Sequence, residues 1–157
     1  MSVIIRKAKE EELKIIQELN HQLFLHDKEY DSFLNMNWPF EKVGKDYFRD
    51  KISGKEGVCF AAEINGELVG YLAGGMAKPY SYRIIKKMSE LENTLVKEDF
   101  RGRGIGEKLF QAFVDWSKSQ GVKRIKVSAS SGNIQAIKFY KKVGFIPCAA
   151  ELEYKIK

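Results

Sequence analysis

Three glycines within five residues, Gly102, Gly104 and Gly106, lie between a predicted strand and a predicted helix, and this segment constrains the fold most strongly. Glycine adopts backbone dihedrals that are closed to other residues and lets a ligand come close to the main chain. At a helix start, unpaired N–H groups and the positive end of the dipole attract anions. The segment therefore predicts a phosphate- or pyrophosphate-binding turn in an α/β protein.

This turn differs from two common phosphate-binding motifs. No Gly-Lys-Ser/Thr follows it, so it is not a P-loop, and Glu107 stands where a dinucleotide fingerprint has its third glycine. Arg101 and Arg103 add hydrogen-bond donors whose positive charge favours a phosphate. Glycine content alone is equally consistent with a flexible turn that caps a helix.

Hydrophobic periodicity predicts a mixed α/β sheet in the order β α α β β β α β α β β, within a single domain over residues 1–157. Asn65-Gly66 between two apolar runs is the preferred pair for a two-residue hairpin turn. The expected strands are Val3–Lys7, Val58–Ile64, Leu68–Ala73, Leu91–Val96, Arg124–Ala129 and a closing strand through Leu152, Tyr154 and Ile156. Four helices are expected. The first carries Leu13 to Leu23, and the second begins at Pro39 and ends before Gly54. The third runs from Gly104 to Gly121, and the fourth runs from Ile134 to Val143 and ends before Gly144.

The charge balance favours anionic partners without choosing among them. Lysine and arginine number 27 against 21 acidic residues, which gives a net charge of +6. Nucleic-acid binding is not expected, because the chain lacks zinc-finger spacing, an RNP-like aromatic sequence and a dense basic helix. The two cysteines and two histidines show no ligand spacing, so no metal site is expected. Without a long apolar run or a leader pattern, we expect no membrane association and a cytoplasmic protein.

After Leu95-Val96, residues 101–106 read R-x-x-G-x-G, and residues 133–145 read N-x-x-A-x-x-F-Y-x-x-x-G-F. These two motifs resemble the signatures of the GNAT superfamily of acyl-CoA-dependent N-acetyltransferases. The first is similar to the acetyl-CoA pyrophosphate loop of that superfamily, and the second is similar to its second signature. Both occur in family order and cover about residues 91–145. Glu98 departs from the pattern, since many members have proline there, and this change should affect loop stiffness more than chemistry.

The resemblance implies transfer of an acetyl group from acetyl-CoA to a primary amine by direct attack in a ternary complex, without a metal. It also implies that Tyr140 is a general acid near the sulfur, since a phenol with a pKa of ~10 can donate to a departing thiolate. The implied acetyl-CoA contacts are the amides of Arg101, Gly102, Arg103, Gly104, Ile105 and Gly106 for the pyrophosphate, and the backbone of Leu95, Val96 and Lys97 with Asn133 for the pantetheine arm.

The sequence does not decide whether Glu90 or Glu92 is the general base. The two residues are two apart on the strand that leads to the point where the sheet is expected to separate and admit the thioester. Either carboxylate could act directly or through a water, and each could equally be an exposed strand residue. Asp27, Glu29 and Asp31 in the first long loop could attract a cationic amine or belong to a solvated acidic loop. The acceptor is an amine on a small molecule or a protein, and the late strands are possible edges for a homodimer. A non-catalytic CoA-binding or regulatory module of the same fold is the alternative.

Overall fold

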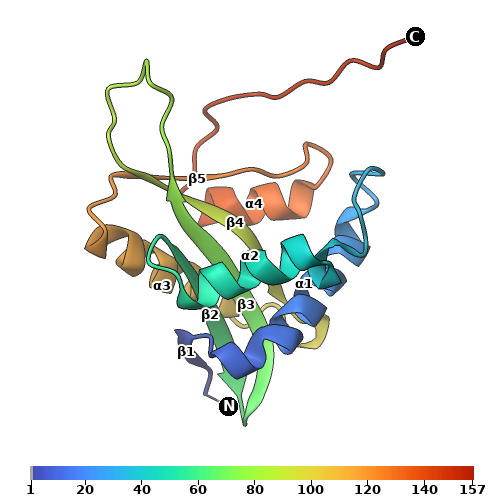
Figure 1. Ribbon diagram of the computed structural model, residues 1–157, viewed down its shortest axis with the longest axis vertical. Helices are drawn as coiled ribbons and strands as arrows, with labels where there is room; N and C mark the ends of the chain where they lie inside the picture. The colour runs from blue at the N-terminus through green and yellow to red at the C-terminus, as the bar shows by residue number, and fades with distance from the viewer. Residues whose placement is uncertain (1) are drawn as a thin grey trace.

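The alternating apolar runs form one mixed sheet in this computed structural model, which describes residues 2–157 (Figure 1). Within these residues the sheet has five strands in the spatial order β1-β2-β3-β4-β5, the same as their order in the chain. The strands are β1 (Ile4–Lys7), β2 (Gly57–Ile64), β3 (Glu67–Ala77), β4 (Met88–Val96) and β5 (Arg124–Val127). The first four pair antiparallel, and β5 pairs parallel to β4.

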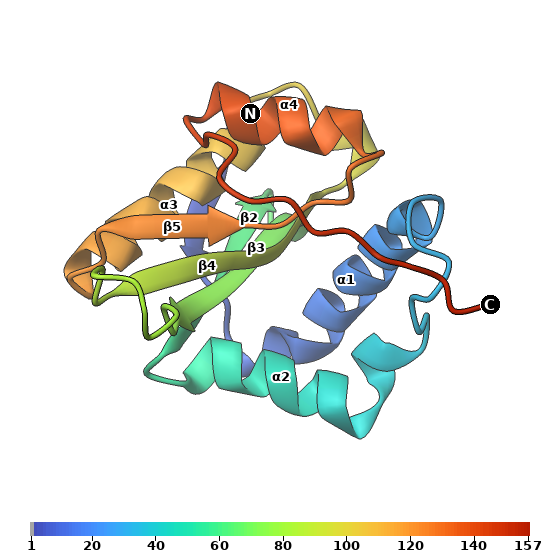
Figure 2. The same ribbon diagram turned by 90° about the horizontal axis from the view of Figure 1, so that it is seen from above.

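Helices cover both faces of this sheet, so each face has its own apolar core (Figure 2). Helices α1 (Leu13–Asp27) and α2 (Lys42–Ser53) lie on one side, and α3 (Ile105–Ser119) lies on the other with α4 (Ile134–Lys142) beyond it. Phe48 and Tyr71 lie in the core under α1 and α2, whereas Leu109 and Phe113 of α3 lie in the second core. All four side chains are fully buried. The predicted mixed α/β class is confirmed.

The hairpin turn between β2 and β3 has the predicted geometry. Asn65 has φ 50° and Gly66 has φ 81°, and a type I′ turn requires positive values at both positions. The strands on either side pair from Ile64–Glu67 back to Gly57–Gly75. Strand β3 then runs on to Ala77, beyond its predicted end, because it has β4 as a second neighbour.

A β-bulge interrupts β4 at Glu92. Leu91 pairs with Gly74 and Asn93 pairs with Ala73, which leaves Glu92 as the extra residue. Leu91 therefore packs into the core on the α3 side, whereas Leu95 packs under α1 and α2, although four residues of regular strand would leave both on one face. The bulge turns Glu92 and Asn93 toward the same side of the sheet, where Lys51 and Tyr47 of α2 contact them.

The expected closing strand is wrong. No helix or strand forms in residues 145–157, and Leu152, Tyr154 and Ile156 are 92%, 77% and 83% exposed. Alternation marks a segment suited to a sheet, but a strand forms only where another strand offers backbone partners. The element order within residues 2–157 thus ends with β5 and α4, without the two last predicted strands.

Smaller differences concern element ends. Pro39 lies in a short 3₁₀ turn, Trp38–Phe40, and α2 begins only at Lys42. Strand β5 ends at Val127, two residues before its predicted end. Along residues 2–157, no helix has both the length and the apolar character needed to cross a bilayer.

Candidate functional site

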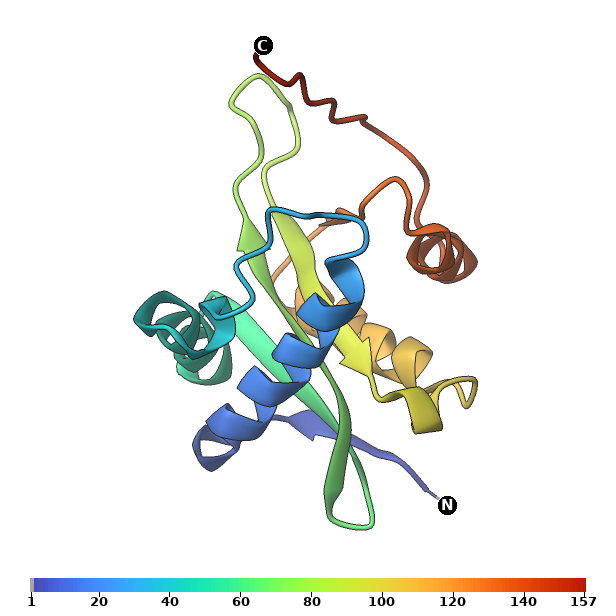
Figure 3. The ribbon, with the colours of Figure 1, turned by 90° about the vertical axis from the view of Figure 1, so that its right-hand side faces the viewer.

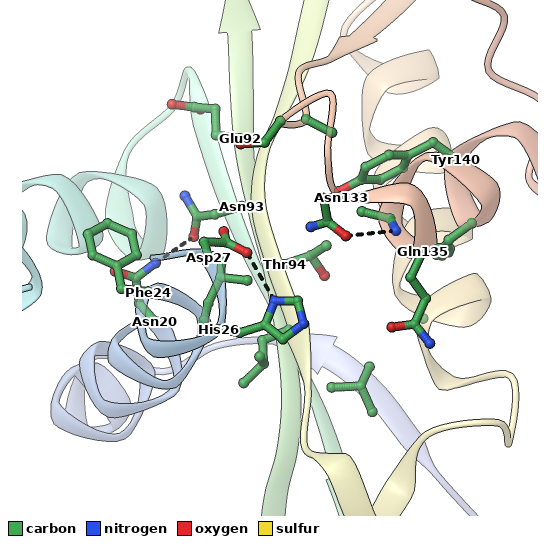
Figure 4. Close-up of a pocket in the computed structure, with 18 of the residues that line it drawn as sticks. Asn20, Phe24, His26, Asp27, Glu92, Asn93, Thr94, Asn133, Gln135 and Tyr140 are labelled. Atoms are coloured by element: carbon green, nitrogen blue, oxygen red, sulfur yellow. Dashed lines mark hydrogen bonds and ion pairs between the residues drawn. The ribbon is translucent and has the colours of Figure 1, made fainter. Parts of the chain in front are cut away.

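A cleft opens where β4 and β5 part. The two strands pair only over Met88–Leu91 and Arg124–Val127, and beyond that point they diverge. The gap between them leads into a cleft of about 1150 Å³, lined by the second half of β4, residues 128–130, the end of α1 and one face of α4 (Figure 4). An open sheet with parallel neighbours places ligands at such a divergence.

The glycine turn forms one end of this cleft. Gly102 and Gly104 have φ of 75° and 76°, and Gly104 is the N-cap of α3 without a side-chain cap. A Cβ at either glycine would meet no atom within 4 Å, so the turn is open on its outer side. Within residues 2–157 the first amide of this helix with an internal partner is that of Lys108, which donates to the Gly104 carbonyl. The amides before it are available to an anion.

Of the cofactor contacts expected from the sequence, all except Lys97 and Arg103 line the cleft. The Lys97 amide donates to the Val69 carbonyl at 2.8 Å, and its own carbonyl accepts from Phe100 at 2.9 Å. These bonds occupy both backbone groups of Lys97. Of the three strand residues expected to hold the pantetheine arm, Leu95 and Val96 line the cleft and Lys97 does not.

The two arginines of the turn brace it in different ways. Arg101 lines the cleft, and its Nε donates to the Val96 carbonyl at 2.8 Å. The Arg103 guanidinium donates to the Asp99 carbonyl at 3.1 Å. Its Cζ lies over the Phe100 ring, 5.3 Å from the ring centroid. The Arg101 bond ties the turn to the end of β4, and the Arg103 bond ties it to the 3₁₀ turn Glu98–Phe100. The positive charges stay at the surface of the turn.

Glu107 follows the turn and lies at the mouth of the cleft. Its Oε1 accepts a hydrogen bond from Lys142 Nζ of α4 at 2.6 Å. The ion pair offsets the negative charge of Glu107 beside the turn. The end of the cleft that the glycine turn forms thus carries Arg101 as its unpaired cation among the residues that the structure describes.

Asn133 begins the helix that forms the far wall. Its Oδ1 accepts from the Ala136 amide at 3.2 Å, so the side chain caps α4. The residue is 9% exposed and lines the cleft, where Figure 4 shows its amide nitrogen on the side away from the cap bond. Capping and ligand contact are therefore compatible, since each uses a different atom of the amide.

Tyr140 lies on the cleft face of α4. Its ring stacks on Phe139 and meets the edge of Phe145, both with centroids 5.6 Å away. Burial, and to a smaller extent the Asp27 carboxylate, raises the pKa of the Tyr140 phenol to about 12. The phenol is therefore fully protonated at neutral pH and can act as a proton donor in the cleft.

Glu90 and Glu92 both line the cleft, on the face of β4 that carries α1 and α2. Glu92 Oε2 accepts from Lys51 Nζ at 2.5 Å, and this bond ties it to α2. Glu90 Oε1 lies 3.8 Å from Lys126 Nζ, a looser contact that leaves the carboxylate freer to turn. Both residues are therefore part of the cleft lining, each with a lysine as its ion-pair partner.

A buried polar network beside them was not anticipated from the sequence. Tyr71 donates to Asn93 Oδ1 at 2.7 Å, and Asn93 Nδ2 donates to the Tyr47 hydroxyl at 2.8 Å. Asn20 Nδ2 donates to the Tyr71 hydroxyl at 2.9 Å, and Asn20 Oδ1 is buried without a partner in the described part of the chain. The one available signal was a polar residue on the apolar stripe of α1. The network fixes Asn93, and with it the bulge.

The end of α1 adds a further carboxylate to the cleft. Asp27 Oδ1 lies 3.2 Å from His26 Nδ1, and both residues line the cleft opposite α4 (Figure 4). Phe24, Phe33 and Trp38 form an aromatic wall beside them. This part of the cleft combines negative charge with flat apolar surface. No group of three or more His, Cys, Asp or Glu side chains within residues 2–157 is arranged to hold a metal ion.

Comparison with known proteins identifies related sequences and folds. An uncharacterised N-acetyltransferase of Methanocaldococcus jannaschii is 30% identical over 128 residues, which are 82% of this chain and 56% of that protein. Streptothricin acetyltransferase of Escherichia coli is 27% identical over 101 residues, 64% of this chain and 54% of the enzyme. The chain thus spans little more than half the length of these relatives.

Solved structures show the same fold. A variant of the BH1408 protein of Bacillus halodurans superimposes with a TM-score of 0.85 at 21% identity, covering 98% of this chain and 99% of that one. The structure of AAC(6')-Iy in complex with a bisubstrate analogue of CoA superimposes with a TM-score of 0.80 at 18% identity, covering 100% and 99%.

The sequence model of the acetyltransferase (GNAT) family matches residues 20–145, which include the bulged strand, the glycine turn and α4. This match extends over well more than half of the chain. The protein belongs to the GNAT family of acetyltransferases.

Proposed function

We propose that residues 1–157 form one N-acetyltransferase domain, which moves an acetyl group from acetyl-CoA to a primary amine by direct attack in a ternary complex. The observation that carries the proposal is the shared cleft. The free amides at the start of α3 open into the same space as Tyr140, Glu90 and Glu92.

The residues present fit acetyl-CoA as the co-substrate. The open glycine turn and Arg101 would hold the pyrophosphate, since helix-start amides and a guanidinium both favour phosphate oxygens. The extended pantetheine arm would lie along Leu95 and Val96, where β4 has no strand neighbour on its cleft side, and would meet Asn133 on the opposite wall. The thioester then lies between β4 and α4.

The amine must lose a proton before it attacks. An alkylammonium with a pKa of ~10.4 costs roughly 4–5 kcal/mol to deprotonate at pH 7. Glu90 or Glu92 would take that proton, directly or through a water, and Glu90 is the less constrained of the two. The amine nitrogen then bonds to the thioester carbon, the C–S bond breaks, and the departing thiolate takes the Tyr140 proton. The nitrogen gives up its second proton to the Tyr140 oxygen, directly or through a water, which restores the phenol. The products are an amide and free CoA.

The acceptor that fits best is a small cationic amine. Asp27, Glu90 and Glu92 supply negative charge around the acceptor half of the cleft, and the wall of Phe24, Phe33 and Trp38 supplies apolar surface. Names of similar proteins point the same way, since they include a streptothricin acetyltransferase and an aminoglycoside N-acetyltransferase. Asp27 would hold a second ammonium group of such a substrate.

The test measures thiol release from acetyl-CoA with a panel of polyamines, aminoglycosides, amino acids and peptides. We expect turnover with at least one polycationic amine, and the Tyr140→Phe variant should lose roughly 10²- to 10⁴-fold in kcat. Its affinity for CoA, measured by calorimetry, should stay within about twofold, because hydroxyl loss leaves the glycine turn intact.

Separate Glu90→Gln and Glu92→Gln variants then assign the base. The base variant should lose kcat, and the loss should shrink with an acceptor of lower pKa. Binding of CoA without turnover of any amine would instead support the alternative, a non-catalytic CoA-binding module. No CoA binding would refute both.

A further inference from the structure

The loop between β3 and β4 projects from one end of the sheet and presents apolar side chains at its outer turn. This loop, residues 78–87, runs out beyond β3 and returns at the start of β4 (Figures 1 and 3). Tyr80, Tyr82 and Ile84 are 69%, 80% and 99% exposed, and Ile84 is the most exposed large apolar side chain in residues 2–157. Apolar side chains that gather at one projecting point mark a contact with another surface.

The same end of the molecule carries a positive charge equal to the net charge of the chain. Six exposed lysines and arginines lie in the loop or beside the adjoining start of β5: Lys78, Arg83, Lys86, Lys87, Lys123 and Arg124. The other 21 basic residues balance the 21 acidic ones, so these six equal the net charge of +6. None of the six forms an ion pair with another residue of the described chain, 2–157. Their charge is therefore available to an anionic partner.

Direct contacts join the two parts of this basic surface. The Lys123 amide donates to the Lys87 carbonyl at 3.4 Å, and Lys87 Nζ donates to the Gln120 carbonyl at 3.2 Å. Arg124 pairs with Met88 where β4 and β5 begin.

The basic surface is separate from the cleft, since none of its six cations lines it. It adjoins the last turn of α3, whereas the glycine turn precedes the first. Fifteen residues of helix, roughly 22 Å, lie between them. Acetyl-CoA bound at the glycine turn therefore does not account for these charges.

The apolar side chains fit a lipid bilayer better than a nucleic acid. Tyr80 and Tyr82 stack on each other, with centroids 5.3 Å apart and an interplanar angle of 7°, so each ring covers one face of the other against a base. The aliphatic Ile84 side chain cannot stack on a base, whereas the hydrocarbon of a bilayer takes it up. Tyrosine, lysine and arginine are all favoured at the level of the lipid headgroups.

We propose that the β3–β4 loop docks this protein on a membrane surface that carries anionic phospholipids. Ile84 and the two tyrosine rings enter the interface, and the six cations lie at the level of the lipid phosphates. The expectation of no membrane association rested on the lack of a spanning segment or a leader, and docking through a folded loop requires neither. The proposal does not depend on the acetyl-transfer reaction.

Sedimentation of the full chain with phospholipid vesicles tests the docking. The vesicles contain phosphatidylcholine alone or an equal mixture of phosphatidylcholine and phosphatidylserine. We expect binding to the mixed vesicles only, and release by salt on the order of 1 M, where the Debye length falls to about 3 Å. Each cation near an anionic surface contributes about fivefold in affinity, so Lys86→Gln/Lys87→Gln should bind roughly 25-fold more weakly.

The matched control for charge is Lys42→Gln/Lys45→Gln, which removes two exposed lysines from α2. Its affinity for the mixed vesicles should stay within about twofold, because the attraction falls off within a Debye length of the membrane. Circular dichroism of both variants should stay native, since all four side chains are exposed.

A dye at the outer turn of the loop tests whether it enters the bilayer. Cys148 is exposed and Cys59 is buried, so a Cys148→Ser background removes the accessible thiol. Ile84→Cys in this background is labelled with an environment-sensitive dye, whose fluorescence should rise on mixed vesicles. Val43→Cys is the control, because Val43 is a 65% exposed apolar residue of α2. Its fluorescence should not change.

Four outcomes would overturn the proposal. They are failure to bind the mixed vesicles at physiological salt, equal loss of binding in the two lysine variants, and unchanged fluorescence of the dye at position 84 on bound vesicles. The fourth is binding to a single-stranded RNA oligonucleotide without binding to vesicles. If Tyr80→Ser/Tyr82→Ser weakened that binding, the surface would be assigned to RNA instead.

Discussion

The Gly104→Ala substitution tests whether the turn before α3 binds the diphosphate of CoA. Gly104 has φ 76°, where a side chain costs roughly 1–2 kcal/mol in backbone strain. The added Cβ meets no atom within 4 Å, so steric clash adds nothing in the free protein. At roughly 2–4 °C per kcal/mol for a chain of this length, the melting temperature should fall by about 2–8 °C.

The loss of CoA affinity should be larger than this strain suggests. The methyl group projects into the open space over the turn, where a phosphate must approach the amides. Loss of one hydrogen bond to a charged group costs roughly 1.5–3 kcal/mol, so the Kd for CoA should rise about ten- to 150-fold. Titration calorimetry gives the Kd, and thermal denaturation gives the strain.

Gly66→Ala provides the matched control. Gly66 has φ 81°, and a Cβ there also meets no atom within 4 Å, but the residue lies in the β2–β3 turn outside the cleft. This variant should lose similar stability and keep its Kd for CoA within about twofold. Equal loss of stability in both variants, with CoA affinity unchanged in both, would refute the assignment of the turn.

Two further variants and one pH profile test other parts of the site. Glu107→Gln frees Lys142 for the phosphates, so the Kd for CoA by calorimetry should fall about two- to fivefold at low salt; weaker binding would contradict this reading. Burial raises the pKa of Tyr140 to about 12, so loss of its proton should cause no decline in kcat until the pH exceeds about 11. A decline with an apparent pKa near 10 that disappears in Tyr140→Phe would show that the phenol keeps its ordinary pKa in the cleft. A Cβ at Gly74 would lie 2.5 Å from the Glu90 carbonyl oxygen, so Gly74→Ala should destabilise the protein by about 1–3 kcal/mol in urea denaturation. Unchanged stability would show that the backbone at the bulge shifts to make room for the added methyl group at little cost in free energy.

Local signals in the sequence sufficed for the features that local backbone chemistry determines. Asn65-Gly66 marked the hairpin, because positive φ at both positions is a property of those two residues. The spacing of Gly102 and Gly104 marked the turn for the same reason, and an apolar stripe marked α3 behind it.

Features that depend on residues far apart in the sequence could not be predicted. The bulge at Glu92 arises from register against β3, which no local pattern of β4 encodes. Asn93 shares hydrogen bonds with Tyr71 of β3 and Tyr47 of α2, so its role shows only in the folded chain. The alternation of Leu152, Tyr154 and Ile156 predicted a closing strand that does not form, because a strand needs backbone partners on a neighbouring strand, which no local pattern supplies.

Titration of ¹⁵N-labelled protein with CoA, followed by amide NMR, tests the central claim most directly. Hydrogen bonds to phosphate should give the largest shifts at Gly102, Gly104 and Gly106, with smaller shifts along Leu95 and Val96 and little change at Gly66. Saturating shifts confined to another surface, or none at all up to millimolar CoA, would contradict the account.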